Sequence, residues 1–418
     1  MSSISNSPAA AVETASFRAD ATVISLVGFA HGTSHFFHLM LPPLFPWFMA
    51  EFGLGYAQVG VLMTVFFVVS GIGQAIAGIW VDRFGAHRVL CAGVGLLACS
   101  GLLVGVAGNF TALMAAAAVA GMGNSVFHPA DFTLLAKRVS SRRMGHAFST
   151  HGISGNLGWA LAPLFMTAIA SEAGWRAAGF GAALFGALAL ALLIWQRDLL
   201  KYELAHESAG HAAASQTSGS ALAFLRAPMV WYAFAFFFFA TFGFGALQNF
   251  GPALLRELFD LSLAASTSAL SIYLLGGSAG LILGGFLAKP GNQHEHYVLF
   301  AFASGAVIAL VLAFVPLPKW LVLPLMAMMG FGIAIAGPSR DLLVRAATKA
   351  RLGEGAYGRV YGTVYSGLDV GLAVAPIAFG LLLDHQYTSL VFVGVALSLV
   401  CGIVAALALG REVVGRPA

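Results

Sequence analysis

The sequence predicts an all-α integral membrane protein in which twelve transmembrane helices form two pseudo-symmetric six-helix bundles. Composition is the first of three supporting observations: 59% of the 418 residues are hydrophobic and only 9% are charged, whereas soluble domains carry roughly 25% charged residues. The second is a series of long apolar runs, and the third is an internal repeat. This composition excludes a soluble globular protein.

A helix needs about 20 apolar residues to cross a bilayer, and the chain contains twelve runs of sufficient length. Some are longer than a straight span, so we expect them to tilt or kink. The runs lie at residues 21–48, 56–80, 88–107, 110–137, 144–170, 175–196, 228–254, 264–288, 297–315, 320–344, 356–383 and 387–410.

Loop charges predict which helix ends face the cytoplasm. If both termini are cytoplasmic, all but three of the 21 Lys and Arg residues lie on that side, the exceptions being Arg176, Arg256 and Lys319. This is the positive-inside bias of membrane proteins. Residues 1–20 lack the apolar segment of a cleavable signal peptide. We expect a monomeric, multi-pass protein of a bacterial-type cytoplasmic (inner) membrane, surrounded by the lipid bilayer and without a nucleic-acid partner.

The two halves of the chain repeat each other. Gly145 to Pro163 aligns without gaps on Gly358 to Pro376, and the segment that begins at Gly121 is echoed from Gly330. Helices four and five are thus repeated as helices ten and eleven. The polar stretch between the halves is typical of a flexible linker. We expect a first bundle at residues 1–198, a cytoplasmic linker at 199–222 and a second bundle at 223–418.

A charged loop between the second and third runs reads Gly-Ile-Trp-Val-Asp-Arg-Phe-Gly-Ala-His-Arg. It resembles the loop between helices two and three of the major facilitator superfamily, which implies the major facilitator fold of two parallel six-helix halves. Asp82 would lie at a helix C-terminus, which disfavours an anion. The resemblance implies that Arg88 and a helix of the opposite half compensate this charge and close the cytoplasmic side. The candidate gating residues are Gly78, Asp82, Arg83, Gly85 and Arg88.

Histidines supply the unusual chemistry of the first half. His31, His35 and His38 lie on one face of helix one. The helical rise places His31 about 15 Å into the membrane and His128 of helix four about 14 Å, where ionisable groups usually face a cavity or a partner. Histidine changes charge near physiological pH, so we expect a proton- or substrate-binding role; neutral histidines bonded to helix carbonyls are the alternative. The candidates are His31, His35, Asn124, His128, Asp131 and His151.

The neighbouring sequence indicates which of these histidines are less central to the expected site. His38 precedes a proline-rich segment and is interpreted as peripheral, and His151 is a lesser candidate for the same network. Pro129 removes a backbone donor and predicts a kink in helix four beside His128.

The second half offers a different set. Arg340 aligns with Asp131 through the repeat. It is either an interfacial arginine whose side chain extends to the headgroups or an anion clamp that pairs with Asp341 when no substrate is bound. Tyr361, Tyr365 and Asp369 form a stripe on helix eleven that either contacts a ligand or packs in the bundle.

A narrower resemblance follows from His31 and from the segment Gly-x-Gly-x-Ser-Val-Phe-His-Pro that ends at Pro129. Both are similar to the fosmidomycin-resistance branch of the superfamily, whose members are proton-driven exporters of small drugs. This chain departs from the branch in two places, because it has His35 where the branch often has an acid and Ala130 followed by Asp131 where it tends to have Glu.

These observations predict a secondary active transporter rather than an enzyme. We expect alternating access with proton-coupled, drug-type export of a small anionic or zwitterionic organic compound, in which the proton gradient supplies the energy and no cofactor or metal takes part. The alternatives are a transporter of a metabolite or a siderophore-like metal chelate, a membrane oxygenase that binds iron through His-x-x-x-His, and a non-transporting sensor.

Overall fold

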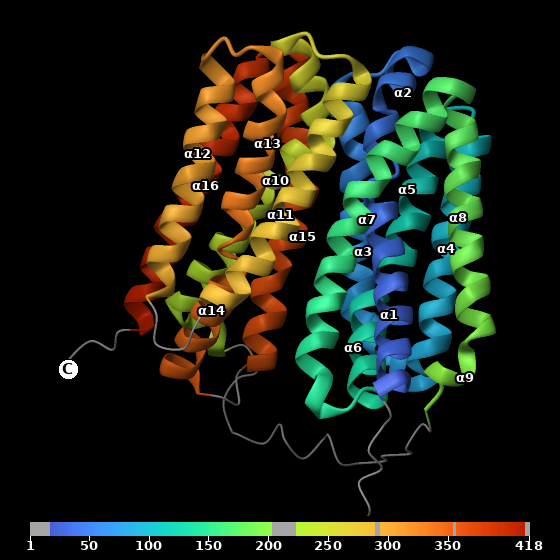
Figure 1. The fold of residues 1–418 in the computed structure, drawn as a ribbon, viewed down its shortest axis with the longest axis vertical. Coiled ribbons are helices and arrows are strands. Elements are labelled where there is room, and N and C mark those ends of the chain that lie inside the picture. Colours follow the sequence, from blue (N-terminus) through green and yellow to red (C-terminus); the bar gives the residue numbers. More distant parts are fainter. Residues whose placement is uncertain (1–16, 203–222, 289–292, 354–356, 414–418) are drawn as a thin grey trace, which may run out of the picture.

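The computed structural model describes residues 17–202, 223–288, 293–353 and 357–413. Within these ranges every regular element is a helix. Figure 1 shows two helical bundles side by side, one made by the first half of the chain and one by the second. Eleven of the described helical segments are long and apolar enough to span a membrane, which is consistent with the predicted twelve. The predicted fold class is confirmed.

The first bundle contains α1 (Phe17–His38), η1 (Pro42–Leu44), α2 (Phe45–Phe52), α3 (Tyr56–Phe84), α4 (Ala86–Val106), α5 (Phe110–Asn124), α6 (Phe127–Arg138), η2 (Ser141–Arg143), α7 (Met144–Ala173), α8 (Trp175–Trp195) and α9 (Arg197–Leu200). The second contains η4 (Ala223–Arg226), α10 (Pro228–Phe259), α11 (Leu263–Leu287), α12 (His294–Phe314), α13 (Lys319–Ala334), α14 (Gly337–Leu352), α15 (Tyr357–Asp384) and α16 (Thr388–Val413). Most of the predicted linker, residues 203–222, lies outside the described residues, so the bundle boundaries stay a prediction.

The first apolar run is not one helix, which corrects the prediction of a span at 21–48. Helix α1 ends at His38, and the chain continues through η1 into the short helix α2. Pro42, Pro43 and Pro46 explain the break, because proline lacks the backbone donor of a helix interior and clashes with the preceding turn.

The fourth and tenth membrane-spanning segments are each interrupted, and the first of these breaks agrees with the kink predicted at Pro129. The breaks fall between α5 and α6 and between α13 and α14. Pro129 and Pro338 each stand in the first turn after the break, four residues beyond Ser125 and Ala334. A proline ring clashes with the carbonyl four residues earlier, so the earlier helix stops there and a new one begins.

The two bundles pack tightly on the side opposite to the described chain ends, here called the far side. A Cβ on Gly60 of α3 would lie 2.5 Å from the carbonyl oxygen of Pro376 on α15. The Asp384 carboxylate accepts hydrogen bonds from the backbone N–H groups of Tyr56 (2.6 Å) and Ala57 (3.0 Å). Asp384 of the second bundle therefore caps the first turn of α3 in the first.

Toward the chain ends the bundles separate, as Figure 1 shows. Gly60 and Gly78 are 18 residues apart, which is five helical turns, so they lie on the same face of α3. The neighbours of the glycines on this face show how far the second bundle lies from α3 at each level. A Cβ on Gly71 would lie 3.6 Å from Asp369, whereas Cβ atoms on Gly78 and on Gly362 of α15 would meet no described atom within 4 Å. The interface between the bundles thus opens toward the side of the chain ends.

Candidate functional site

The stripe of histidines predicted on helix one is present on α1. The ring centroids of His31 and His35 are 4.4 Å apart, and those of His35 and His38 are 4.8 Å apart. Gly155 of α7 leaves room for this stripe, because a Cβ there would lie 2.7 Å from the His35 ring and 3.0 Å from His31 Nε2. The small residue on α7 thus allows the imidazoles to fill the contact between the two helices.

Asp131 is the centre of the site. Its side chain is fully buried, and its Oδ2 lies 3.1 Å from His151 Nε2 and 3.2 Å from His31 Nδ1. Of these two contacts, the one with His151 is aligned as a hydrogen bond. The His31 and His151 rings stack with centroids 3.5 Å apart. His151, a lesser candidate by sequence, therefore belongs to the centre of the cluster.

Several buried polar atoms around Asp131 have no hydrogen-bond partner within the described chain, among them Asp131 Oδ1 and His35 Nδ1. Unpaired polar groups in a low-dielectric interior are costly, and they mark positions where a proton, water or ligand is bound. Within the described residues, the polar atoms of this site are therefore incompletely paired.

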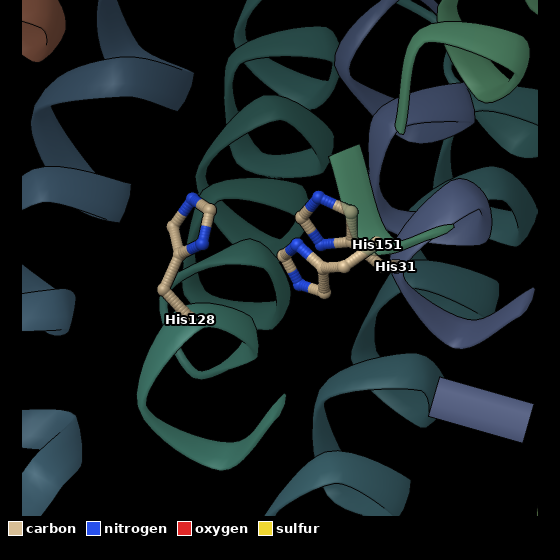
Figure 2. A group of neighbouring side chains, drawn as sticks. All are labelled: His31, His128 and His151. Carbon is tan, nitrogen blue, oxygen red and sulfur yellow. The ribbon is translucent and has the colours of Figure 1, made fainter. Parts of the chain in front are cut away.

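His128 faces this buried pair from α6. Its ring centroid is 5.4 Å from that of His31 and 6.1 Å from that of His151. Figure 2 shows the single ring of His128 opposite the two neighbouring rings. Unlike the other two, His128 is exposed. Its accessible ring therefore lies at the edge of the buried cluster.

The three imidazoles could supply metal ligands, since one nitrogen of each lies within 4.8 Å of the others. Zinc–nitrogen bonds of 2.0–2.1 Å in a tetrahedral site place ligand atoms only about 3.3 Å apart. The observed spacing is wider, and the stacked His31 and His151 rings would have to reorient to converge on one ion. The geometry is that of an imidazole–carboxylate cluster rather than of a formed metal centre.

Asn124 organises a second polar layer. Its Oδ1 accepts a hydrogen bond from Ser34 and lies 2.7 Å from His38 Nε2, and its Nδ2 donates to Ser70 Oγ on α3. His38 is thus part of the network, which corrects its interpretation as peripheral. The helix break directly after Asn124 places this amide between α1 and α3.

Trp159 is a site residue that sequence reasoning missed. Its ring centroid is 4.2 Å from that of His35, and its indole Nε1 is buried without a described partner. The available signal was its position beside Gly158, a residue shared by the repeat, two turns beyond His151 on α7.

In the second bundle Arg340 lies inside the helix packing. Its guanidinium carbon is 4.5 Å from the ring centroid of Phe237, which is fully buried on α10. Its Nε donates to Asp341 Oδ1 at 2.9 Å, and the Tyr365 hydroxyl donates to the same oxygen at 3.4 Å. Arg340 packs on Phe237 and pairs with Asp341, and the choice between an interfacial arginine and an anion clamp stays a prediction.

The stripe predicted on helix eleven is only partly described. The side chain of Tyr361 lies outside the described residues. Asp369 is half-buried against Gly71 of α3, at the level where the bundles begin to separate. In the described chain it makes no ion pair, although its depth predicted a partner.

The loop that carries the candidate gating residues is a tight turn between α3 and α4. Gly85 joins α3 to α4 with a φ of +86°, a conformation that favours glycine. Asp82, Arg83 and Arg88 are exposed, and within the described residues Asp82 has no ion pair with Arg88 or with the second bundle. The expected closure contact is absent here, since the bundles are apart on this side.

Far-side charges are paired locally. Glu51 accepts hydrogen bonds from Arg176 (2.7 Å) and from the Trp175 indole (2.6 Å), and Lys319 lies 2.6 Å from Asp260 Oδ2. Hydrogen bonding to the Arg176 guanidinium lowers the pKa of Glu51 below its usual range. Two of the three basic residues that charge counting placed outside the cytoplasm are thus neutralised by acids.

Comparison with known proteins agrees with this architecture. The model of the Major Facilitator Superfamily matches residues 24–356. The fosmidomycin resistance protein of Escherichia coli (strain K12) is 25% identical over 393 residues, which cover 92% of this chain and 91% of that protein. The probable 4-methylmuconolactone transporter of Cupriavidus pinatubonensis is 31% identical over 176 residues, which cover 41% of this chain and 40% of that protein.

A solved structure has the same fold. It is a bacterial homologue of the human lysosomal transporter Spinster in an inward-facing and occupied conformation. It superposes with a TM-score of 0.71 at 14% sequence identity, covering 96% of this chain and 97% of that one. The predicted resemblance to this superfamily and to its drug-resistance branch is confirmed.

Proposed function

We propose that this chain, which belongs to the major facilitator superfamily, exports a small organic compound across the cytoplasmic membrane by alternating access in exchange for protons. The observation that carries the proposal is the buried Asp131 carboxylate, held between His31 and His151 with one oxygen unpaired. An ionisable cluster inside a membrane protein is costly and is a mark of ion or substrate pathways.

Charge pairing in this cluster supports a proton-binding role. One imidazolium compensates the Asp131 carboxylate, whereas two imidazolium rings stacked 3.5 Å apart would repel each other. The cluster therefore holds one proton stably, and a second proton makes it cationic. We propose that the exposed His128 passes protons between the outside of the cluster and this buried pair.

Alternating access requires that the two ends of the bundle interface open in turn. In the described conformation the far side is held by Asp384 and the glycine contacts, while the side of the chain ends is apart. We propose that the open side is cytoplasmic, because most Lys and Arg residues lie there. The observed state would then receive cargo from the cytoplasm, and closure at Asp82 and Arg88 would precede release outside.

The relatives support two cargo classes. The likeness to a fosmidomycin resistance protein over most of both chains supports drug-type export. A metabolite transporter is the second candidate, since the 4-methylmuconolactone relative is the more identical of the two, although over a shorter segment. A metal chelate is a further form of this alternative, because the imidazole trio offers ligands to a bound ion.

The test has two stages. A deletion strain that expresses the chain is grown against fosmidomycin, other antibiotics and organic anions, and the protected compound becomes the substrate for proteoliposomes. Asp131→Asn and His128→Ala should each abolish flux driven by a pH gradient. His146→Ala is the matched control, because His146 is exposed on α7 one turn before the cluster. Full gradient-driven flux in both site variants would refute the proton role of this cluster.

A further inference from the structure

We infer that a cavity between the two bundles on the far side is a second binding site, and that it takes a small aromatic carboxylate which also carries a hydroxyl or N–H group. The site is separate from the histidine cluster, since none of the cluster residues lines it. Both bundles supply its walls, so a bound ligand also holds the far side closed. The site adds to the proposed export and depends neither on the cargo nor on the proton-binding residues.

The cavity has the size and the walls of a small-molecule site. Its volume is about 460 Å³, and ligand pockets span roughly 300–1,000 Å³. The ring centroids of Phe45 in the first bundle and Phe250 in the second are 6.1 Å apart, and the Tyr56 ring lies 5.9 Å from that of Phe250. Such walls suit a flat aromatic ring. Their apolar members include Pro42, Pro43, Phe45, Pro46, Met49 and Phe250.

Arg256 and Tyr56 give the cavity a cation and a hydroxyl from opposite bundles. Arg256 stands in the last turn of α10 and is exposed, and Tyr56 is the first residue of α3. Within the described residues neither the guanidinium nor the hydroxyl makes a hydrogen bond or an ion pair. A carboxylate can accept from both, because a guanidinium presents several donors in a plane and a phenol one more.

The acids at the same rim have other partners. Glu257 accepts a hydrogen bond from the Thr388 hydroxyl, and Asp260 Oδ2 lies 2.6 Å from Lys319 Nζ. Neighbouring residues of a helix do not face each other, so Glu257 is not placed as a counter-ion of Arg256. The charge of Arg256 is therefore open to an anion that enters the cavity.

Asn249 adds a hydrogen-bond acceptor to the wall. The residue is 4% exposed, and its Nδ2 donates to the Gly245 carbonyl at 2.7 Å. This bond fixes the orientation of the amide, because only the Nδ2 group can donate to a carbonyl. The Oδ1 is left buried without a described partner, which is costly for an acceptor. A hydroxyl or N–H group of the ligand would complete it.

The position of the cavity links its occupancy to the conformation of the protein. Asp384 caps the turn of α3 that begins at Tyr56, so the far-side contact and the cavity share this turn. Opening of the far side would move Tyr56 away from Arg256 and take the site apart. A ligand that bridges the two residues therefore binds the closed state better and shifts the equilibrium toward it.

Isothermal titration of the purified full-length protein with three matched probes tests the site. Para-coumarate carries a carboxylate and a phenol, cinnamate lacks the phenol, and methyl para-coumarate lacks the charge. Wild type should bind para-coumarate more tightly than either of the others. Arg256→Gln should weaken para-coumarate binding at least about tenfold, as expected for a lost charge-assisted pair, and should leave binding of the methyl ester unchanged.

Further variants separate the groups of the site. Asn249→Leu should remove the preference for para-coumarate over cinnamate, because it removes the acceptor for the phenol. Arg226→Gln removes an exposed arginine that precedes α10 at the opposite end of the second bundle, and it should bind like wild type. Arg256 is itself exposed, so Arg256→Gln keeps the test decisive even if Asn249→Leu fails to fold.

Equal para-coumarate binding by Arg256→Gln and wild type would overturn the inference, and so would a wild type that binds none of the probes. A loss of para-coumarate binding in Asp131→Asn as large as that in Arg256→Gln would assign the probe to the histidine cluster, which would overturn it as well. A failure of the proposed export appears instead in the flux assays and leaves these titrations unchanged.

Thiol labelling tests the closing effect. Ser271 of α11 is buried and donates a hydrogen bond to the Ala160 carbonyl of α7, at a contact between the bundles that does not line the cavity. Ser271→Cys, in a background without the native cysteines, is a reporter of opening in the purified protein. Para-coumarate at about ten times its Kd should slow maleimide labelling by up to about tenfold. An unchanged labelling rate would refute the closing effect.

Discussion

Removal of the Asp384 carboxylate should open the far side of the bundle interface. This carboxylate accepts hydrogen bonds from the Tyr56 and Ala57 amides at the first turn of α3, at 2.6 and 3.0 Å. Both bonds join one bundle to the other, so they exist only while the far side is closed. Asp384→Ala removes them without touching the histidine cluster or Arg340.

The size of the effect follows from the geometry. Loss of a helix N-cap costs about 0.5–2 kcal/mol, and because Asp384 is exposed we take about 1 kcal/mol for the closed state. A change of about 1.4 kcal/mol is tenfold in an equilibrium, so the open-to-closed ratio should rise about fivefold. Asp384→Asn keeps an acceptor oxygen and should lie between wild type and Asp384→Ala.

Thiol labelling measures this ratio. Cys91, Cys99 and Cys401 are first replaced, and Thr167→Cys then places a reporter at the buried far-side contact between Thr167 and Thr267. A membrane-impermeant maleimide should label this cysteine about fivefold faster in Asp384→Ala cells. Asp198→Ala, which removes an exposed acid near the chain-end side, is the control. An unchanged labelling rate in Asp384→Ala would refute the closing role of this contact.

Two further predictions follow from the interface glycines and from the far-side charges. Gly60→Leu should misfold or aggregate on size-exclusion chromatography, since its Cβ would lie 2.5 Å from the Pro376 carbonyl. Gly78 has no described neighbour at its Cβ position, so Gly78→Leu should give a monodisperse protein whose transport is blocked because the added side chain prevents closure on the side of the chain ends. Wild-type transport by Gly78→Leu would contradict this closure. The lowered pKa of Glu51 means that its contribution to stability is complete above the ordinary glutamate pKa and is lost as pH falls through the lowered value. The difference in melting temperature between wild type and Glu51→Gln should therefore shrink as pH falls from 7 to 3.5, and a difference independent of pH would contradict the Arg176 pairing.

Local patterns in the sequence predicted most elements of this fold. The apolar runs predict the spans because length and hydrophobicity are properties of each segment alone. The spacing of His31, His35 and His38 predicts a shared face because helical periodicity is local. Pro129 predicts the break beside His128 for the same reason, as proline acts on its own turn. The end of the first helix was missed, although Pro42, Pro43 and Pro46 carried the signal.

What the sequence by itself determined is therefore which residues can lie on one face of one helix. Only the tertiary structure decided which faces meet. It brought His151 of α7, together with His31 of α1, to Asp131, set Trp159 against His35, and placed Arg340 on Phe237. Each of these contacts joins different helices, so it depends on crossing angles and on the backbone approach that residues such as Gly155 and Gly158 permit. Helix periodicity carries no information about that approach, because the partner helix lies elsewhere in the chain.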